Sequence, residues 1–141
     1  KTRKDASVTD AMPIETWSGE PYAYLTTIGR RTGRPHRIEI WFAVHGGRVY
    51  LMSGGRDRAD WVRNVMANGQ VRIELGGETY AGTARIVSSD EEDDHLARDL
   101  LVRKYATAKE PLADWKRRSL PVVIEIQGID ASGANVEGAS R

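Results

Sequence analysis

Three arginines lie close together in residues 27–36, and two glycines flank the first pair of them. The arginines are Arg30, Arg31 and Arg34, and the glycines are Gly29 and Gly33. Guanidinium groups bind phosphate through paired hydrogen bonds, and glycine lets a backbone approach an anion closely. The spacing therefore predicts a site for a phosphate-bearing small molecule, and the alternative is a solvated surface turn.

A second candidate site follows the next apolar run, where Ser53, Gly54 and Gly55 precede a helical segment. A serine hydroxyl and glycine N–H groups at such a junction favour contact with a phosphate or an oxyanion, although an ordinary loop is the alternative. On the helix, Trp61 and Asn64 are three residues apart and so share a face. Trp61 either lies in the core or contacts a ligand, whereas a buried Asn64 amide needs polar partners.

The sequence lacks the residues for several other kinds of chemistry. It has no cysteine, which excludes disulfides, thiol catalysis and cysteine-bound metals. His36, His45 and His95 have no carboxylate at metal-ligand spacing, so no metal site is expected. A net charge of +1 does not favour nucleic acid as a partner. No apolar run approaches the roughly 18 residues that span a bilayer.

The elements that must position these residues are mostly strands joined by glycine turns. Apolar and alternating runs predict strands over residues 22–28, 38–44, 48–53, 70–75, 78–87 and 121–126. The glycine pairs at 46–47 and 76–77 predict tight hairpin turns. Helical spacing predicts helices over 59–67 and 90–105 and a helical turn at 111–115, and the Asn-Gly pair at 68–69 predicts a left-handed helix cap.

The order of these elements predicts the fold class. Six strands joined largely by hairpins, with helices before the fourth and the last strand, indicate a small antiparallel barrel with helices packed outside. The length of 141 residues fits one domain. We expect the barrel over residues 20–128, a mobile N-terminal segment over 1–19 and a loose C-terminal tail over 129–141.

Four segments in series resemble the deazaflavin-dependent nitroreductase family of actinobacteria. Residues 26–35, TTIGRRTGRP, are similar to the family pattern TTxGRxTGxP. Residues 41–47 resemble the second strand and hairpin of the family, 53–65 its serine–glycine and Trp-x-x-Asn stretch, and 120–124 its closing strand. The resemblance covers residues 20–127 of the chain.

The resemblance implies a split antiparallel β-barrel of the FMN-binding-like class, with coenzyme F420 as the cofactor. F420 carries a phosphodiester and a polyglutamate tail, which suit an arginine-rich groove by charge. Several relatives have lysine at position 54 and some have arginine at position 36, where Arg56 and Arg37 would have to compensate here. The cofactor-binding residues expected from the motifs and the resemblance are Arg30, Arg31, Thr32, Gly33, His36, Arg37, Ser53, Gly54, Gly55, Arg56, Trp61 and Asn64.

The resemblance also implies a reaction, in which reduced F420 gives a hydride to a small electron-poor acceptor: a quinone, a coumarin or other unsaturated lactone, an enone or a nitroaromatic compound. Tyr105 and Trp115 are expected to line the acceptor site, with packing of the outer helices as the alternative. Trp41 either lines the ring pocket or lies in the core. The alternative functions are an FMN-dependent oxidoreductase on the same barrel and a non-catalytic F420 carrier.

The resemblance finally implies a location and an oligomeric state. We expect a cytoplasmic protein, a monomer or homodimer with no integral membrane segment. Contact with the inner face of the membrane, if the protein makes it, is expected through the N-terminal segment 1–19.

Overall fold

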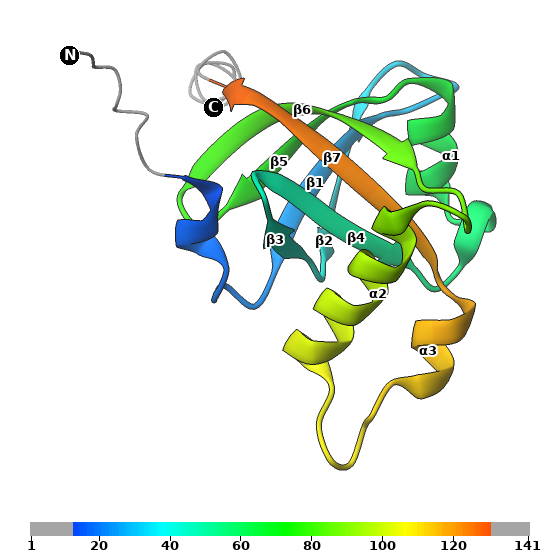
Figure 1. Ribbon diagram of the computed structural model, residues 1–141. Helices are drawn as coiled ribbons and strands as arrows, with labels where there is room; N and C mark the ends of the chain where they lie inside the picture. Colours follow the sequence, from blue (N-terminus) through cyan, green and yellow to red (C-terminus); the bar gives the residue numbers. More distant parts are fainter. Residues whose placement is uncertain (1–12, 131–141) are drawn as a thin grey trace.

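One antiparallel sheet of seven strands forms most of the fold, which the computed structural model describes over residues 13–130 (Figure 1). The strands are β1 (Ala23–Ile28), β2 (Pro35–Ile40), β3 (Ala43–His45), β4 (Arg48–Ser53), β5 (Gln70–Leu75), β6 (Glu78–Ile86) and β7 (Leu120–Ile129). They pair in the order β2-β1-β5-β6-β7-β4-β3, so β2 and β3 are the two edges of a curled, split barrel. The predicted fold class is confirmed, with seven strands in place of six.

Glycines make two of the hairpin turns that the sequence predicts. Gly46 and Gly47 join β3 to β4 with φ of 59° and 79°, a region that residues with a Cβ rarely occupy. Gly76, between β5 and β6, has a φ of 61°. These turns help to fix the register in which paired strands present alternate side chains to the core.

The side chains inside the curl of the sheet form the main hydrophobic core. Burial alternates along β1, where Ala23, Leu25 and Thr27 are buried. β4 is instead buried on both faces along most of its length, and β7 is buried on both faces over residues 121–124. The main core lies on one side of these two strands and helix α2 (Glu92–Tyr105) on the other. This double burial explains why the last strand has a continuous apolar run in the sequence.

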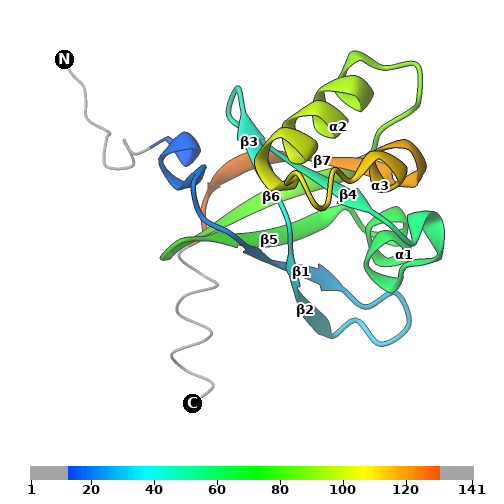
Figure 2. The same cartoon turned by 90° about the horizontal axis from the view of Figure 1, so that it is seen from below.

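Three helices pack around the sheet (Figures 1 and 2). α2 lies on the outer face of β4 and β7, where its Ala97 and Leu101 are fully buried. α1 (Asp60–Ala67) lies at one end of the curl and sends Val65 into the main core. The short α3 (Ala113–Arg118) follows α2 and leads directly into β7. No helix within residues 13–130 combines the length and the apolar character that a membrane span needs.

The predicted strand over residues 38–44 is wrong in one respect, because the chain leaves the sheet at Trp41 and Phe42. The Phe42 N–H donates to the Tyr105 hydroxyl at 3.1 Å, and the Phe42 carbonyl accepts from Lys104 Nζ at 3.0 Å. Two side chains of α2 thus take the backbone hydrogen bonds that a neighbouring strand would otherwise supply. The interruption separates β2 from β3, and these become the two edges of the sheet.

The end of α1 differs from the prediction, and the two predicted terminal segments lie partly outside the described residues. The expected left-handed cap after α1 is wrong, since Asn68 is extended with a φ of −152° and its N–H donates to the Asn64 carbonyl. A 3₁₀ helix, η2 (Ile14–Trp17), lies within the N-terminal segment predicted over 1–19, and its Ile14 is buried in the main core. The remainder of that segment over 1–12 lies outside the described residues, as do residues 131–141 of the tail predicted over 129–141, whose first residue, Ile129, ends β7.

Gly82 tests the packing between β6 and β7, beside the irregularity in their pairing. A Cβ added there would lie 2.7 Å from Ile124 Cγ2 and 2.8 Å from the Glu125 carbonyl oxygen. We therefore expect Gly82→Ala to lower the free energy of unfolding by about 1–3 kcal/mol. Gly77→Ala is the matched control, because its Cβ would meet nothing within 4 Å. Denaturant titration measures the free energy of unfolding of both variants. Equal values would show that β6 and β7 can move apart at Gly82 without loss of stability.

Candidate functional site

The arginine turn between β1 and β2 has a defined backbone conformation. The Gly29 N–H donates to the Arg34 carbonyl at 2.7 Å, and the Gly33 N–H donates to the Gly29 carbonyl at 2.8 Å. Gly33 has a φ of 75°. A Cβ on Gly29 would lie only 2.6 Å from Nε2 of the His36 ring. The turn therefore requires glycine at one position for its backbone conformation and at the other for the close approach of an imidazole.

Asn64 of α1 ties the turn to the body of the protein. Its side chain is buried, at 3% exposure. Its Oδ1 accepts from the Arg30 N–H at 3.1 Å and from Arg30 Nη1 at 2.9 Å, and its Nδ2 donates to Thr27 Oγ1 at 3.1 Å. The polar partners that a buried amide needs are thus supplied by the fold itself. Asn64 positions the arginine turn.

A cavity of about 210 Å³, the arginine cavity, opens beside this turn. Its lining consists of Arg30, Arg31, Thr32, His36, Asp60 and Asn64. Arg30 forms an ion pair with Asp60 at 3.1 Å. The exposed Arg31 guanidinium, by contrast, has no hydrogen bond or ion pair with any residue between 13 and 130. The cavity therefore offers one uncommitted guanidinium on a fixed backbone, which suits an anionic group.

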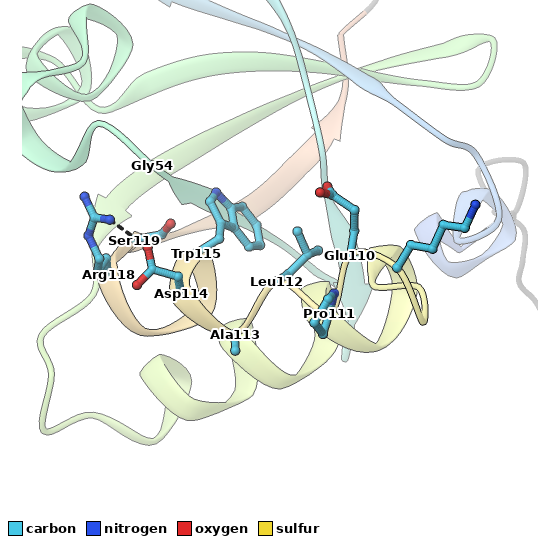
Figure 3. A pocket seen from close by; sticks show the side chains of 10 residues that line it. Gly54, Glu110, Pro111, Leu112, Ala113, Asp114, Trp115, Arg118 and Ser119 are labelled. Carbon is cyan, nitrogen blue, oxygen red and sulfur yellow. Dashed lines mark hydrogen bonds and ion pairs between the residues drawn. The ribbon is translucent and has the colours of Figure 1, made fainter.

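A larger cavity of about 510 Å³, the α3 cavity, lies where α3 approaches the end of β4 (Figure 3). Its lining comes from residues 109–115, 118 and 119, together with Gly54. Trp115 extends from α3 toward Gly54, and a Cβ on Gly54 would lie 3.3 Å from Trp115 Nε1. The lack of a side chain at position 54 therefore allows the Trp115 ring to approach the backbone closely.

The three aromatic residues predicted for the acceptor site are brought together by the fold. The rings of Trp41 and Tyr105 are stacked, with centroids 4.3 Å apart and an interplanar angle of 4°. Trp41 also meets Trp115 edge to face, with centroids 5.5 Å apart and an angle of 78°. Trp115 lines the α3 cavity, whereas Trp41 and Tyr105 do not. They support the position of Trp115 from the side away from the cavity.

Two arginines fix the end of α3, the helix that carries Trp115. Arg98 of α2 forms a two-point ion pair with Asp94, at 2.8 and 3.2 Å, and also donates to the Lys116 carbonyl. Arg56 Nη1 donates to the Arg118 carbonyl at 2.6 Å. Carbonyls in the last turn of a helix have no partner within the helix, so these guanidinium groups cap α3.

The loop after β4 borders both cavities, because Gly54 lines the α3 cavity and Asp60 the arginine cavity. The hydroxyl of the buried Ser53 donates to the Arg56 carbonyl at 3.0 Å. Gly55 precedes the short 3₁₀ helix η3 (Arg56–Arg58), in which Arg56 has a φ of 54°. Asp60 is the first residue of α1, so this loop connects a residue of one cavity to a residue of the other.

Several predicted cofactor residues do not line the arginine cavity, and two of them, Arg37 and Trp61, have their side chains engaged elsewhere. Arg37 is bound to Glu74 at 3.0 Å, and its guanidinium lies 4.1 Å from the centre of the Tyr24 ring. Trp61 packs against the main core, which agrees with the expectation from the sequence. Neither side chain is part of the lining of the arginine cavity.

Lys104 has an environment that the sequence does not reveal. Its Nζ lies 3.7 Å from the centre of the Phe42 ring and donates to the Phe42 carbonyl. Burial lowers the pKa of Lys104 to about 8, and the charge of Glu20 opposes this shift. Burial also raises the pKa of Tyr105, so its hydroxyl keeps its proton at neutral pH. Both groups act on the backbone of Phe42 and line neither cavity.

Several cavity residues were not identified from the sequence, among them Asp60 and Ser119. Asp60 begins α1, where an acidic residue is ordinary, and its importance follows only from its contact with Arg30, 30 residues away. Ser119 is a small polar residue in front of an apolar strand, and this pattern carries no functional signal. Among the residues that the structure describes, no group of three or more His, Asp and Glu side chains is arranged to hold a metal ion.

Comparison with known proteins gives a family match over most of the chain. The model of the family described as F420H(2)-dependent quinone reductase matches residues 3–127. The matched range includes the arginine turn, the loop after β4 and all of α3.

Solved structures with a similar fold have low sequence identity to this chain. An F420-H2 dependent reductase, FDR-A, is 23% identical with a TM-score of 0.61, and the match covers 77% of this chain and 95% of that one. A conserved hypothetical protein of Mycobacterium tuberculosis is 22% identical with a TM-score of 0.70, over 92% and 87% of the two chains. The haem storage protein HutZ of Vibrio cholerae is 18% identical with a TM-score of 0.65, over 82% and 89%. These similarities establish the fold.

Asn64 provides a test of how the arginine turn is held. Asn64→Ala would leave the buried Thr27 hydroxyl and the Arg30 N–H without their partner. We expect a loss of about 1–3 kcal/mol in the free energy of unfolding, measured by denaturant titration. Asn68→Ala is the control, since Asn68 Oδ1 accepts a single exposed bond, from the Gln70 N–H at 3.0 Å. A stability unchanged in both variants would contradict a positioning role for Asn64.

Proposed function

The chain belongs to the F420H(2)-dependent quinone reductase family, and we propose that it passes a hydride from reduced F420 to a flat, quinone-like acceptor bound against Trp115 in the α3 cavity. As a member of this family it is an oxidoreductase, and its cofactor is coenzyme F420. The proposal concerns the class of acceptor and the residues that hold the two molecules.

The arginine cavity fits the anionic part of F420. A phosphodiester or a glutamate carboxylate is an acceptor of hydrogen bonds, and a guanidinium supplies paired donors for it. Arg31 is the group that supports this assignment most, because it lines the cavity, is exposed and has no partner within residues 13–130. Arg30 is less available, since Asn64 and Asp60 already bind its guanidinium.

The α3 cavity fits a planar ring system. Trp115 presents an aromatic wall that is supported by the stacked pair of Trp41 and Tyr105, and flat ligands gain from burial and stacking against such a wall. Gly54 also lines the cavity and extends no side chain into it. A deazaflavin ring here and an anionic tail at Arg31 would place the cofactor along the loop that borders both cavities.

The contribution of the protein to the reaction is binding and orientation. F420H2, when bound, supplies the hydride. Trp115 and Gly54 limit the positions that a planar acceptor can take, which brings the reacting rings together. The Tyr105 proton is not available to the acceptor, because the hydroxyl donates to the Pro21 carbonyl at 2.9 Å. Solvent is therefore the source that we propose for the proton that completes the reduction.

A binding and turnover assay separates this function from its alternatives. Titration with F420 and with FMN decides the cofactor, and oxidation of F420H2 against a panel of a quinone, a coumarin, an enone and a nitroaromatic compound decides the acceptor class. We expect saturable F420 binding and the highest kcat/KM with the quinone. Tight FMN binding without F420 binding, or F420 binding without turnover of any acceptor, would favour the flavin enzyme or the carrier instead.

Arg31 gives the sharpest test of the cofactor site. Arg31→Ala should raise the dissociation constant for F420 roughly 10- to 150-fold, which corresponds to the loss of about 1.5–3 kcal/mol from a charge-assisted hydrogen bond. Affinity in the unchanged protein should also fall as salt is added, because exposed charges are screened. Fluorescence titration of F420 at low and high ionic strength measures both effects.

Arg34→Ala is the matched control for that experiment. Arg34 is an exposed guanidinium on the same turn, but it does not line the arginine cavity. We expect its loss to change F420 affinity by less than about threefold, since only long-range charge is removed. Equal effects of the two substitutions would mean that F420 senses the general charge of the turn and not a site at Arg31.

Tyr105 tests the support of the acceptor wall. Tyr105→Leu removes the ring that stacks on Trp41, so we expect a several-fold rise in the KM for a quinone, with F420 affinity changed less than about twofold. Tyr105→Phe keeps the ring and removes the bonds to Phe42 and Pro21. Tyr105→Phe should lower the free energy of unfolding by about 1–3 kcal/mol and leave the KM for the quinone nearly unchanged. A rise in KM for Tyr105→Phe as large as that for Tyr105→Leu would contradict this assignment.

A further inference from the structure

Two hydrogen-bond donors without partners lie near Gly54 in the lining of the α3 cavity. A Cβ placed on Gly54 would lie 3.3 Å from Trp115 Nε1 and 3.9 Å from Ser119 Oγ. Neither donor has a hydrogen-bond partner among residues 13–130. The space that a side chain at position 54 would fill is therefore bordered by an indole N–H and a hydroxyl.

The hydroxyl of Ser119 is unusual because it is buried. Its residue is 1% exposed, and its Oγ is an unsatisfied buried polar atom. Most buried polar groups in proteins have a partner, and those without one destabilise the fold. Ser53, a neighbouring serine with 2% exposure, follows the rule, since its hydroxyl donates to the Arg56 carbonyl at 3.0 Å. A ligand in the cavity would supply the partner that Ser119 lacks.

The chemistry of the two donors defines the ligand atom. An indole N–H can only donate, so the atom it meets must be an acceptor. A carbonyl oxygen has two lone pairs and can accept from both groups at once. The charged residues that line the cavity balance, with Lys109 and Arg118 against Glu110 and Asp114, and Arg118 is bound to Asp114 at 2.7 Å. The cavity therefore favours a neutral acceptor atom over an anion.

The two donors are held in place before any ligand arrives. Both belong to the segment 115–119, whose carbonyls are capped by Arg98 and Arg56. The Trp115 ring is braced by the edge contact with Trp41. Donors that are fixed in advance lose little entropy on binding, which increases their contribution to affinity.

We propose that Trp115 Nε1 and Ser119 Oγ together bind a ring carbonyl oxygen of the molecule that lies over Gly54. The proposal rests on the proposed function, and two molecules of that reaction carry such an oxygen: the deazaflavin ring of F420 and a quinone acceptor. Trp115 and Ser119 are ligand-binding residues in this assignment, and Gly54 is the position that must stay without a side chain.

Ser119→Ala separates a ligand-binding role from a structural one. We expect the melting temperature without ligand to stay the same or to rise, because an unsatisfied hydroxyl is removed. Affinity for the molecule that supplies the carbonyl should fall about fivefold, the effect of one hydrogen bond. Ser89→Ala, at an exposed serine away from both cavities, is the control and should change neither quantity. A lower melting temperature with unchanged affinity would overturn the proposal.

Two binding measurements identify the source of the carbonyl. The dissociation constant of oxidised F420, without acceptor, reports on the cofactor. The KM for menadione at saturating F420H2 reports on the acceptor, and a nitroaromatic compound without a carbonyl is the comparison. A rise only in the F420 constant assigns the oxygen to the cofactor, and a rise only in the menadione KM assigns it to the quinone. No change in either overturns the proposal.

The indole N–H of Trp115 gives a readout that is independent of turnover. The chain has four tryptophans, and Trp115→Phe identifies the Trp115 resonance among the indole N–H signals of a ¹⁵N-labelled sample. We expect that signal to shift downfield on addition of F420 or menadione, and Gly54→Ala to abolish the shift. If the unchanged protein binds neither molecule, the proposed function fails along with this assignment. If it binds them without the shift, only this assignment fails.

Discussion

The hydroxyl of Tyr105 decides where the sheet is interrupted. It accepts from the N–H of Phe42, 63 residues earlier in the chain, at 3.1 Å and donates to the Pro21 carbonyl at 2.9 Å. Because the chain leaves the sheet at this point, Trp41 can stack on Tyr105 and meet Trp115. The end of β2, the start of β3 and the aromatic support of the α3 cavity thus meet at this contact between a helix and an interrupted strand.

The arginines in and beside the two cavities divide into those that other groups already hold and Arg31, which is free to bind. Asn64 and Asp60 hold Arg30, while Arg98 and Arg56 donate to carbonyls of α3. Such residues are already ordered, so they position other groups and contribute little new binding. Arg31 is the exposed guanidinium of the arginine cavity, and its donors can go to a ligand. The sequence alone cannot separate these roles, which depend on the neighbours that the fold provides.

The sequence predicts the local features of this fold well, because short segments determine them. The glycine turns, the alternating strand β5 and the helices α1 and α2 lie close to their expected positions. The strand interruption at Phe42 was missed because the residues that cause it are distant in sequence. Sequence reasoning indicated that Asn64 needs partners, but its partner Arg30 is 34 residues away. Ser119 has no pattern that marks it, since only the tertiary structure leaves its hydroxyl unpaired.

Three energetically unfavourable features, two positive φ values and one unpaired buried hydroxyl, lie in or beside the α3 cavity. Leu112, at the start of α3, and Arg56, in the loop after β4, have φ of 62° and 54°, which residues with a Cβ rarely adopt. The unpaired Ser119 hydroxyl lies on the same cavity. Each such feature costs about 1–3 kcal/mol and persists only where surrounding contacts enforce it. The Arg98 and Arg56 contacts to α3 supply that enforcement. The packing of the sheet core thus offsets the free-energy cost of these features. The donors that line the cavity remain unpaired and can form hydrogen bonds with a ligand.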